Sequence, residues 1–242
     1  MGALLTNFNF LLAYGDERAL AGLDSEGRFR LLEKIVHSGP SEANWRAMLE
    51  LLASWPEDEK KTQAYDWLHT KLENWDDRIR QVNSAWTFLY RDGQLSSIAN
   101  IVRSVLISHR EQNGNTELKS IVSTPEIRNI RSLTIHKSDI YIGGLRALVD
   151  SPYLTNLSSL ALEGLTLSDE KFQVLFDARH FNSLTRLRLK DVNLRLDRLQ
   201  QLLHSQLITT VTDLEIPYND LDKATALALV KTIRPQLRVV LE

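Results

Sequence analysis

Apolar residues recur every three or four positions through the first hundred residues, which is the spacing of helices with one buried face. Asp24 or Ser25 is the expected N-cap of the first helix, and Ser41 is the expected N-cap of the second. Residues 1–100 are therefore expected to form an all-α N-terminal capping domain of short antiparallel helices. The stripes predict helices over residues 25–38, 42–55, 57–75 and 79–91.

The pattern changes near residue 101, where apolar residues begin to recur in columns with a period of 27 residues. One column contains Leu133, Leu160, Leu187 and Leu214. A second column, two residues later, contains Ile135, Leu162, Leu189 and Ile216. Positions two apart share one face of a strand, whereas Leu145, Leu148 and Val149 have the i, i+3, i+4 spacing of a helix. Each unit thus predicts one short strand, a turn and one helix.

Successive units should pair their strands in parallel and bury the leucine columns between strands and helices. The expected opening residues are Val102, Ile130, Leu157, Leu184, Val211 and Leu237. The last step is 26 residues, which would place Val240 in the first leucine column. We expect this last strand to be either a bare edge or an edge covered by a partner.

These columns match the leucine-rich-repeat pattern L-x-x-L-x-L-x-x-N-x-L over roughly residues 102–242. The unit length resembles the ribonuclease-inhibitor-like subclass, and residues 144–157 are similar to repeats of bacterial proteins. The resemblance implies that residues 101–242 form an α/β solenoid of four to five repeats. This would be a horseshoe arc with a parallel sheet inside and helices outside, used for protein binding. The asparagine of the pattern is present as Asn219, whereas Leu165 and Val192 replace it in other units.

Side chains at alternate strand positions face away from the leucine columns and are expected to line the concave face. Twelve residues near these positions are the candidate partner-binding set: Ser132, Thr134, His136, Ser159, Ala161, Glu163, Arg186, Arg188, Lys190, Asp213, Glu215 and Tyr218. Three ion pairs are expected between adjacent strands: Arg186–Asp213, Arg188–Glu215 and Lys190–Glu163. They admit two interpretations, namely ion pairs on a solvated sheet or a charged recognition surface with Tyr218 and His136 as anchors.

Charge and composition narrow the class of protein. The 242 residues carry 29 Lys and Arg against 31 Asp and Glu, and a net charge of −2 argues against nucleic-acid or anionic-membrane binding. No apolar run reaches the roughly 18 residues of a membrane span, and no basic region typical of a signal peptide begins the chain, so a cytoplasmic protein is expected. The absence of Cys excludes a disulfide scaffold, a cysteine zinc site and a thiol nucleophile.

The two parts of the chain differ in composition as well as in pattern. Residues 1–100 have 11 basic and 15 acidic side chains, whereas residues 101–242 have 18 and 16. All five tryptophans lie in the first hundred residues, at Trp45, Trp55, Trp67, Trp75 and Trp86. Their positions fall on the helical stripes, so we interpret them as core residues rather than ligand-stacking groups.

No phosphate-binding glycine loop, His-Glu-x-x-His motif or nucleophile elbow occurs in the sequence. The sequence therefore favours a noncatalytic protein–protein interaction module that binds a partner on the concave face and needs no cofactor or metal. Two alternatives remain open. The protein could regulate an enzyme, as a GTPase-activating repeat protein does, with an exposed arginine such as Arg195. It could instead be a structural subunit that docks through its C-terminal edge strand.

Overall fold

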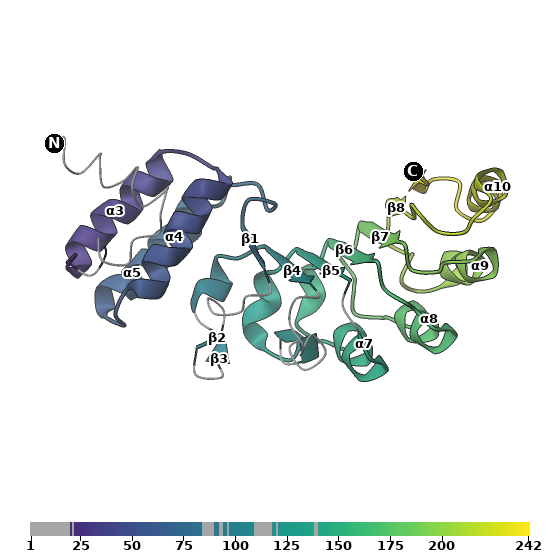
Figure 1. The fold of residues 1–242 in the computed structure, drawn as a ribbon, viewed down its shortest axis with the longest axis horizontal. Coiled ribbons are helices and arrows are strands. Elements are labelled where there is room, and N and C mark those ends of the chain that lie inside the picture. Colours follow the sequence, from purple (N-terminus) through teal and green to yellow (C-terminus); the bar gives the residue numbers. More distant parts are fainter. Residues whose placement is uncertain are drawn as a thin grey trace. The chain divides into compact units, whose positions relative to one another are not determined.

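The chain divides into two compact units in the computed structural model. It describes residue 20 and residues 22–83, 90–91, 94–95, 97–108, 118–119, 121–137 and 140–242 (Figure 1). Residues Met1–Gln81 and Ala85–Val102 form the first, which we call the helical unit. Residues Val82–Ser84 and Arg103–Glu242 form the second, the sheet unit. Trp86 lies outside the described residues.

The helical unit contains α3 (Ser25–His37), α4 (Glu42–Ser54), α5 (Glu59–Lys71) and a short 3-10 helix, Ser97–Asn100. A side chain caps the first turn of each α-helix by accepting a backbone hydrogen bond. The carboxylate of Asp24 accepts one from Gly27 N at 2.7 Å, and the Ser41 hydroxyl accepts one from Asn44 N at 3.1 Å. The predicted caps Asp24 and Ser41 are confirmed, and Asp58 caps α5 in the same way.

The tryptophans of this unit serve mainly as core residues. Trp45, Trp55 and Trp75 are buried, which confirms the core interpretation for these three. Trp67 is half-buried and packs its ring against Phe29, with 5.6 Å between the ring centroids and 57° between the planes. Such tilted aromatic pairs add to the stability already gained from burial.

The third predicted helix ends earlier than expected. α5 stops at Lys71, so Trp75 lies in the turn that follows it instead of on the helix. The guanidinium of Arg80 donates a hydrogen bond to Leu72 O at 3.0 Å, and Arg80 is itself buried. A carbonyl at the end of a helix needs such a partner, and Arg80 provides one here.

The fourth predicted helix, over residues 79–91, is wrong. The region holds two short strands, β1 (Gln81–Asn83) and β2 (Tyr90–Arg91). β1 lies next to β4 in the sheet, so its backbone bonds to another strand rather than along a helix. β2 pairs antiparallel with β3 (Gln94–Leu95), and the Asp-Gly dipeptide between them in the sequence favours a hairpin as much as a helix stop.

The sheet unit is built on a seven-stranded sheet with the order β1-β4-β5-β6-β7-β8-β9. Every pairing from β4 to β9 is parallel. The strands after β1 are β4 (Ser104–Ser108), β5 (Ser132–His136), β6 (Ser159–Glu163), β7 (Arg186–Lys190), β8 (Asp213–Glu215) and β9 (Arg238–Val240). Short 3-10 helices precede β5 and β6, at Pro125–Asn129 and Leu154–Asn156.

Residues 27 apart in the sequence lie opposite each other in this sheet. Leu133 pairs with Leu160, Leu160 with Leu187, and Leu187 with Leu214. All four leucines are buried, as are the residues of the second apolar column. The sequence period is therefore the pairing register from β5 to β8, which packs like side chains above one another.

Four helices connect these strands and lie along one side of them (Figure 1). They are α7 (Ile142–Val149), α8 (Asp169–Phe176), α9 (Leu196–His204) and α10 (Lys223–Ile233). The three apolar residues predicted for the first of these helices, Leu145, Leu148 and Val149, are all buried. The protein thus belongs to the α/β class, with a parallel sheet and helices on one of its sides.

The last strand differs from its expected register. Val239, and not Val240, pairs with Leu214, so the final step is 25 residues. The reason is a short connection, because only residues 234–237 separate α10 from β9. Val239 is half-buried, whereas Leu214 is fully buried.

Candidate partner-binding face

Exposure alternates along the strands of the sheet unit. In β5 the side chains of Leu133 and Ile135 are buried, and those of Ser132, Thr134 and His136 are half-buried. Most of the candidate residues alternate with the buried columns in this way. We call the surface that they form the sheet face. Its eleven strand residues are Ser132, Thr134, His136, Ser159, Ala161, Glu163, Arg186, Arg188, Lys190, Asp213 and Glu215.

Three rows cross the sheet face because strand pairing sets residues 27 apart side by side. The first row is Ser132, Ser159, Arg186 and Asp213. The second row is Thr134, Ala161, Arg188 and Glu215. The third row is His136, Glu163 and Lys190. Side chains on β5 and β6 are mostly small, whereas those on β7 and β8 are charged.

Arg188 is the centre of the charged half. Its Nε donates to Glu163 Oε1 at 2.7 Å, and its Nη1 donates to a carboxylate oxygen of Glu215. The expected contact with Glu215 is confirmed, and the contact with Glu163 is additional. The other Glu163 oxygen lies 3.3 Å from Nδ1 of His136. One arginine therefore holds the carboxylates of the strands on both sides of its own.

The other two expected ion pairs are wrong. Asp213 pairs with Arg238 of the edge strand, although Arg186 is its partner in register. Arg188 takes the place of Lys190 at Glu163, because its Nε reaches sideways to that carboxylate. The Lys190 ammonium lies instead over the ring of Tyr218, 5.3 Å from its centroid, which is a cation–π contact.

Two groups on this face have shifted pKa values. Burial alone lowers the pKa of the Arg188 guanidinium, but hydrogen bonds to Glu215 and Glu163 raise it more, so the pKa lies above its ordinary value. The Thr212 hydroxyl and the Arg238 guanidinium, both bonded to the Asp213 carboxylate, lower the pKa of Asp213. These bonds keep both groups charged over a wide pH range.

The residue that follows each strand has a left-handed backbone. Lys137, Gly164, Asp191 and Tyr218 occupy the same position in successive units, with φ between 47° and 62°. Lys137 N donates to Glu163 O at 2.8 Å, Gly164 N to Lys190 O at 2.9 Å, and Asp191 N to Pro217 O at 3.1 Å. The turn therefore extends the ladder by one hydrogen bond.

Tyr218 is unusual among these four residues. A bulky side chain is disfavoured in the left-handed region, where Gly and Asn are common. The Tyr218 side chain nevertheless remains 73% exposed, and its listed ring contact is with Lys190. The sequence did not predict this conformation, although Gly164 at the equivalent position was a signal that it could have used.

Asn219 fixes the turn between β8 and α10. Its Oδ1 accepts hydrogen bonds from Val192 N and Leu194 N, both at 3.0 Å. Its Nδ2 donates to Leu189 O at 2.7 Å and to Ile216 O at 3.1 Å. The expectation that this side chain satisfies backbone groups of the turn is confirmed.

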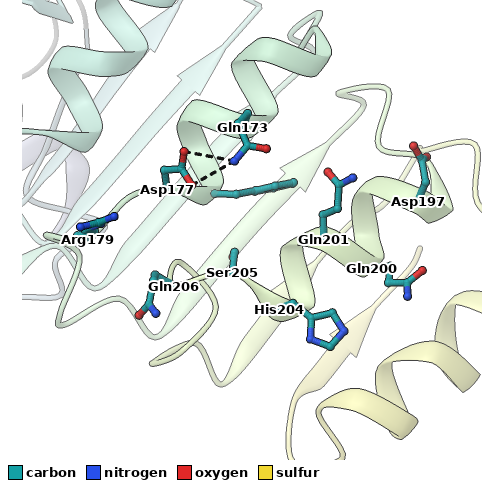
Figure 2. A pocket seen from close by; sticks show the side chains of 10 residues that line it. Gln173, Asp177, Arg179, Asp197, Gln200, Gln201, His204, Ser205 and Gln206 are labelled. Carbon is teal, nitrogen blue, oxygen red and sulfur yellow. Dashed lines mark hydrogen bonds between the residues drawn. The ribbon is translucent and has the colours of Figure 1, made fainter.

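A hollow of about 610 Å³ lies between α8 and α9, away from the sheet face (Figure 2). Figure 2 shows amide side chains around it, and Gln173 donates to the Asp177 carboxylate at 3.2 Å. His204 and Ser205 both line it, as a hydrolase pair would. The Ser205 hydroxyl, however, donates to Leu202 O at 2.7 Å, so it is not oriented as a nucleophile toward the histidine.

Three further observations bear on the alternatives. Arg195, the candidate arginine of an enzyme regulator, pairs with Asp197 at 3.3 Å and with Asp169 at 3.5 Å. No group of three or more His, Asp or Glu side chains that could hold a metal ion occurs in the described part of the chain. Among the same residues, no helix is both long and apolar enough to cross a membrane.

Comparisons with known proteins do not assign the chain to a family. No protein-family model matches it, and no curated protein matches it.

Proposed function

We propose that residues 102–242 form a leucine-rich-repeat arc whose sheet face binds a partner protein without catalysing a reaction. The pairing register of 27 residues and the buried leucines at equivalent positions support the repeat assignment. The left-handed residue after each strand supports it further, because one backbone geometry recurs in four successive units.

The observation that carries the binding proposal is the alternation of exposure along the strands. Helices cover the buried columns on one side of the sheet (Figure 1). The opposite side chains are at least partly exposed, apart from Ala161, and they combine a small-residue half with a charged half. Such a face offers shape on one side and polar groups on the other, which is the combination that protein interfaces use.

The small-residue half is the part most open to a partner helix or loop. Ser132, Ser159 and Ala161 have short side chains that leave the backbone of β5 and β6 within reach. A large side chain introduced at this point would occupy the space that a partner needs. Ser159→Tyr is the matched way to block the face, since its side chain projects from the middle of the sheet.

The test is selection of linear peptides from a displayed random library on the immobilised protein. Selected peptides should bind Ser159→Tyr about ten-fold more weakly than the original protein, since central contacts dominate interface energies. Gln201→Tyr in α9, which adds the same side chain at an exposed site off the face, should leave binding unchanged. Circular dichroism of both variants checks that each is folded.

Equal binding to the original protein and to Ser159→Tyr would contradict the proposal. Failure to enrich any peptide on the original protein would contradict it as well.

A further inference from the structure

The carboxylates of the sheet face are already bonded to groups of the protein. Glu163 and Glu215 share Arg188, and Glu163 also faces His136. Asp213 accepts hydrogen bonds from Arg238 and, at 2.8 Å, from the Thr212 hydroxyl. The acidic groups of this face therefore have limited capacity for cations from outside.

Two cations on the same face are in the opposite situation. Arg186 is exposed and, within the described residues, forms no ion pair with a carboxylate. Lys190 likewise has no carboxylate partner among the described residues, and its ammonium lies over the Tyr218 ring. Both charges thus remain available to an outside group. The face is mixed in composition but presents cationic groups to a ligand.

Tyr218 adds an aromatic surface beside these charges. Its backbone has a φ of 57°, a conformation that a small residue would adopt with less strain. Strained residues of this kind concentrate at functional sites, where the surrounding structure holds them in place. An exposed tyrosine next to a lysine is also typical of the anchor positions of protein interfaces.

We propose that the occupant of the sheet face is an acidic segment of a partner protein, whose carboxylates pair with Arg186 and Lys190 and which packs a side chain against Tyr218. This inference rests on the proposed function and adds the chemistry of the partner to it. The argument for the occupant is charge complementarity, because the free charges of the face are positive and its negative charges are already held.

The test uses two labelled probes, a copolymer of Glu and Tyr and a copolymer of Lys and Tyr, measured by fluorescence anisotropy. The Glu–Tyr copolymer should bind about ten-fold more tightly than the Lys–Tyr copolymer at low ionic strength. Its binding should weaken when salt is raised, because exposed charges are screened. Tighter binding of the Lys–Tyr copolymer, or binding of neither copolymer, would overturn the inference.

Charge reversal locates the binding site. The double variant Arg186→Glu/Lys190→Glu should bind the Glu–Tyr copolymer about ten-fold more weakly. The matched control is Arg179→Glu/Lys231→Glu, which makes the same change in net charge at exposed residues off the sheet face. An equal loss in both double variants would show general attraction to a less acidic protein and would overturn the inference.

Tyr218 variants separate binding from folding. Tyr218→Asn, which the left-handed backbone accepts, should keep or raise the free energy of unfolding while weakening Glu–Tyr copolymer binding about three-fold. Tyr218→Phe retains the aromatic face and should retain binding. Unchanged binding in Tyr218→Asn would remove the tyrosine from the proposed contact.

The two proposals can fail separately. If peptides selected on the protein depend on Ser159 but the Glu–Tyr copolymer does not bind, the acidic occupant is wrong and the binding face stands. If neither the selected peptides nor the copolymer depends on residues of the sheet face, both proposals are wrong.

Discussion

The helical unit buries Arg28, Lys61 and Arg80, whereas the sheet unit holds Arg186, Arg188 and Lys190 on an accessible face. The buried cations bond mainly to backbone carbonyls, which ties helix ends and turns together. The cations of the sheet face bond to side chains or remain open. A buried cation is a structural element that its partners must satisfy, but an accessible one is available for recognition.

The units also differ in how their polar backbone groups are satisfied. In the sheet unit one solution repeats, as in the hydroxyls of Ser158, Thr185 and Thr212, each of which donates to the carbonyl of an equivalent residue in the preceding unit. In the helical unit each bond is particular to one residue. Single substitutions should therefore have larger effects in the helical unit than in most of the sheet unit.

Removal of Arg80 should have the largest effect. Its guanidinium donates to Leu72 O at 3.0 Å and to Ile101 O at 2.9 and 2.6 Å, within a buried site. Arg80→Ala leaves these carbonyls without that donor and should lower the free energy of unfolding by about 3 kcal/mol. Urea denaturation followed by tryptophan fluorescence measures this unit selectively, since all five tryptophans lie in residues 1–100.

The matched control is Arg46→Ala in α4, where the side chain is exposed. This change should alter the free energy of unfolding by less than about 0.5 kcal/mol. Equal effects of the two substitutions would mean that burial of Arg80 does not contribute to stability.

Asn219 is the exception in the sheet unit, because a single side chain bonds to several backbone groups there. Asn219→Ala should lower the free energy of unfolding of this unit by about 2 kcal/mol. Far-ultraviolet circular dichroism and hydrogen exchange of β7 and β8 are the measurements, because this unit has no tryptophan. Asn182→Ala at an exposed loop position is the control, and a loss as large in that variant would contradict the role of Asn219.

The helical unit should lose stability at alkaline pH. Burial, with a contribution from the Glu57 charge, raises the pKa of the Tyr65 phenol. Above pH of about 10 the unfolded chain releases this proton while the folded chain keeps it, so the free energy of unfolding falls as pH rises. Tyr65→Phe should flatten the dependence in fluorescence-detected denaturation, and an unchanged slope would exclude Tyr65 as its source.

The sheet unit should show a smaller effect at acidic pH. The pKa of Asp213 is lowered in the folded chain, so its contribution is complete above about pH 4 and disappears as pH falls through the lowered value. The side chain is partly accessible, which limits the contribution to below about 1 kcal/mol. Asp213→Asn should remove it, and an identical acid transition in that variant would rule the residue out.

Much of the sheet unit could be predicted because its pattern is local and repeats. Leu187 and Leu189 identify a strand by their spacing, and Leu199, Leu202 and Leu203 identify a helix. The first part of the chain was harder. The apolar spacing of residues 79–91 fits a helix, but the strand pairing of β1 depends on β4, which the local pattern does not contain.

The candidate site was predicted as a set of positions but not as a set of contacts. Register gave the neighbours of Arg186 and Lys190 correctly, yet neither forms the expected ion pair. Long side chains choose among several carboxylates within reach, and the edge strand supplied Arg238 as a competitor. Reach and competition are properties of the assembled sheet, so the sequence period does not encode them.

The sequence by itself determined the alternation of strand and helix, the 27-residue register from β5 to β8 and the side of each strand that is buried. These follow from the spacing of apolar residues, because burial selects one face of each element. The tertiary structure decided that residues 81–83 form a strand, that Val239 rather than Val240 pairs with Leu214, and that Arg188 holds two glutamates. Those outcomes depend on backbone and charged groups distant in the chain, which only the folded sheet brings together.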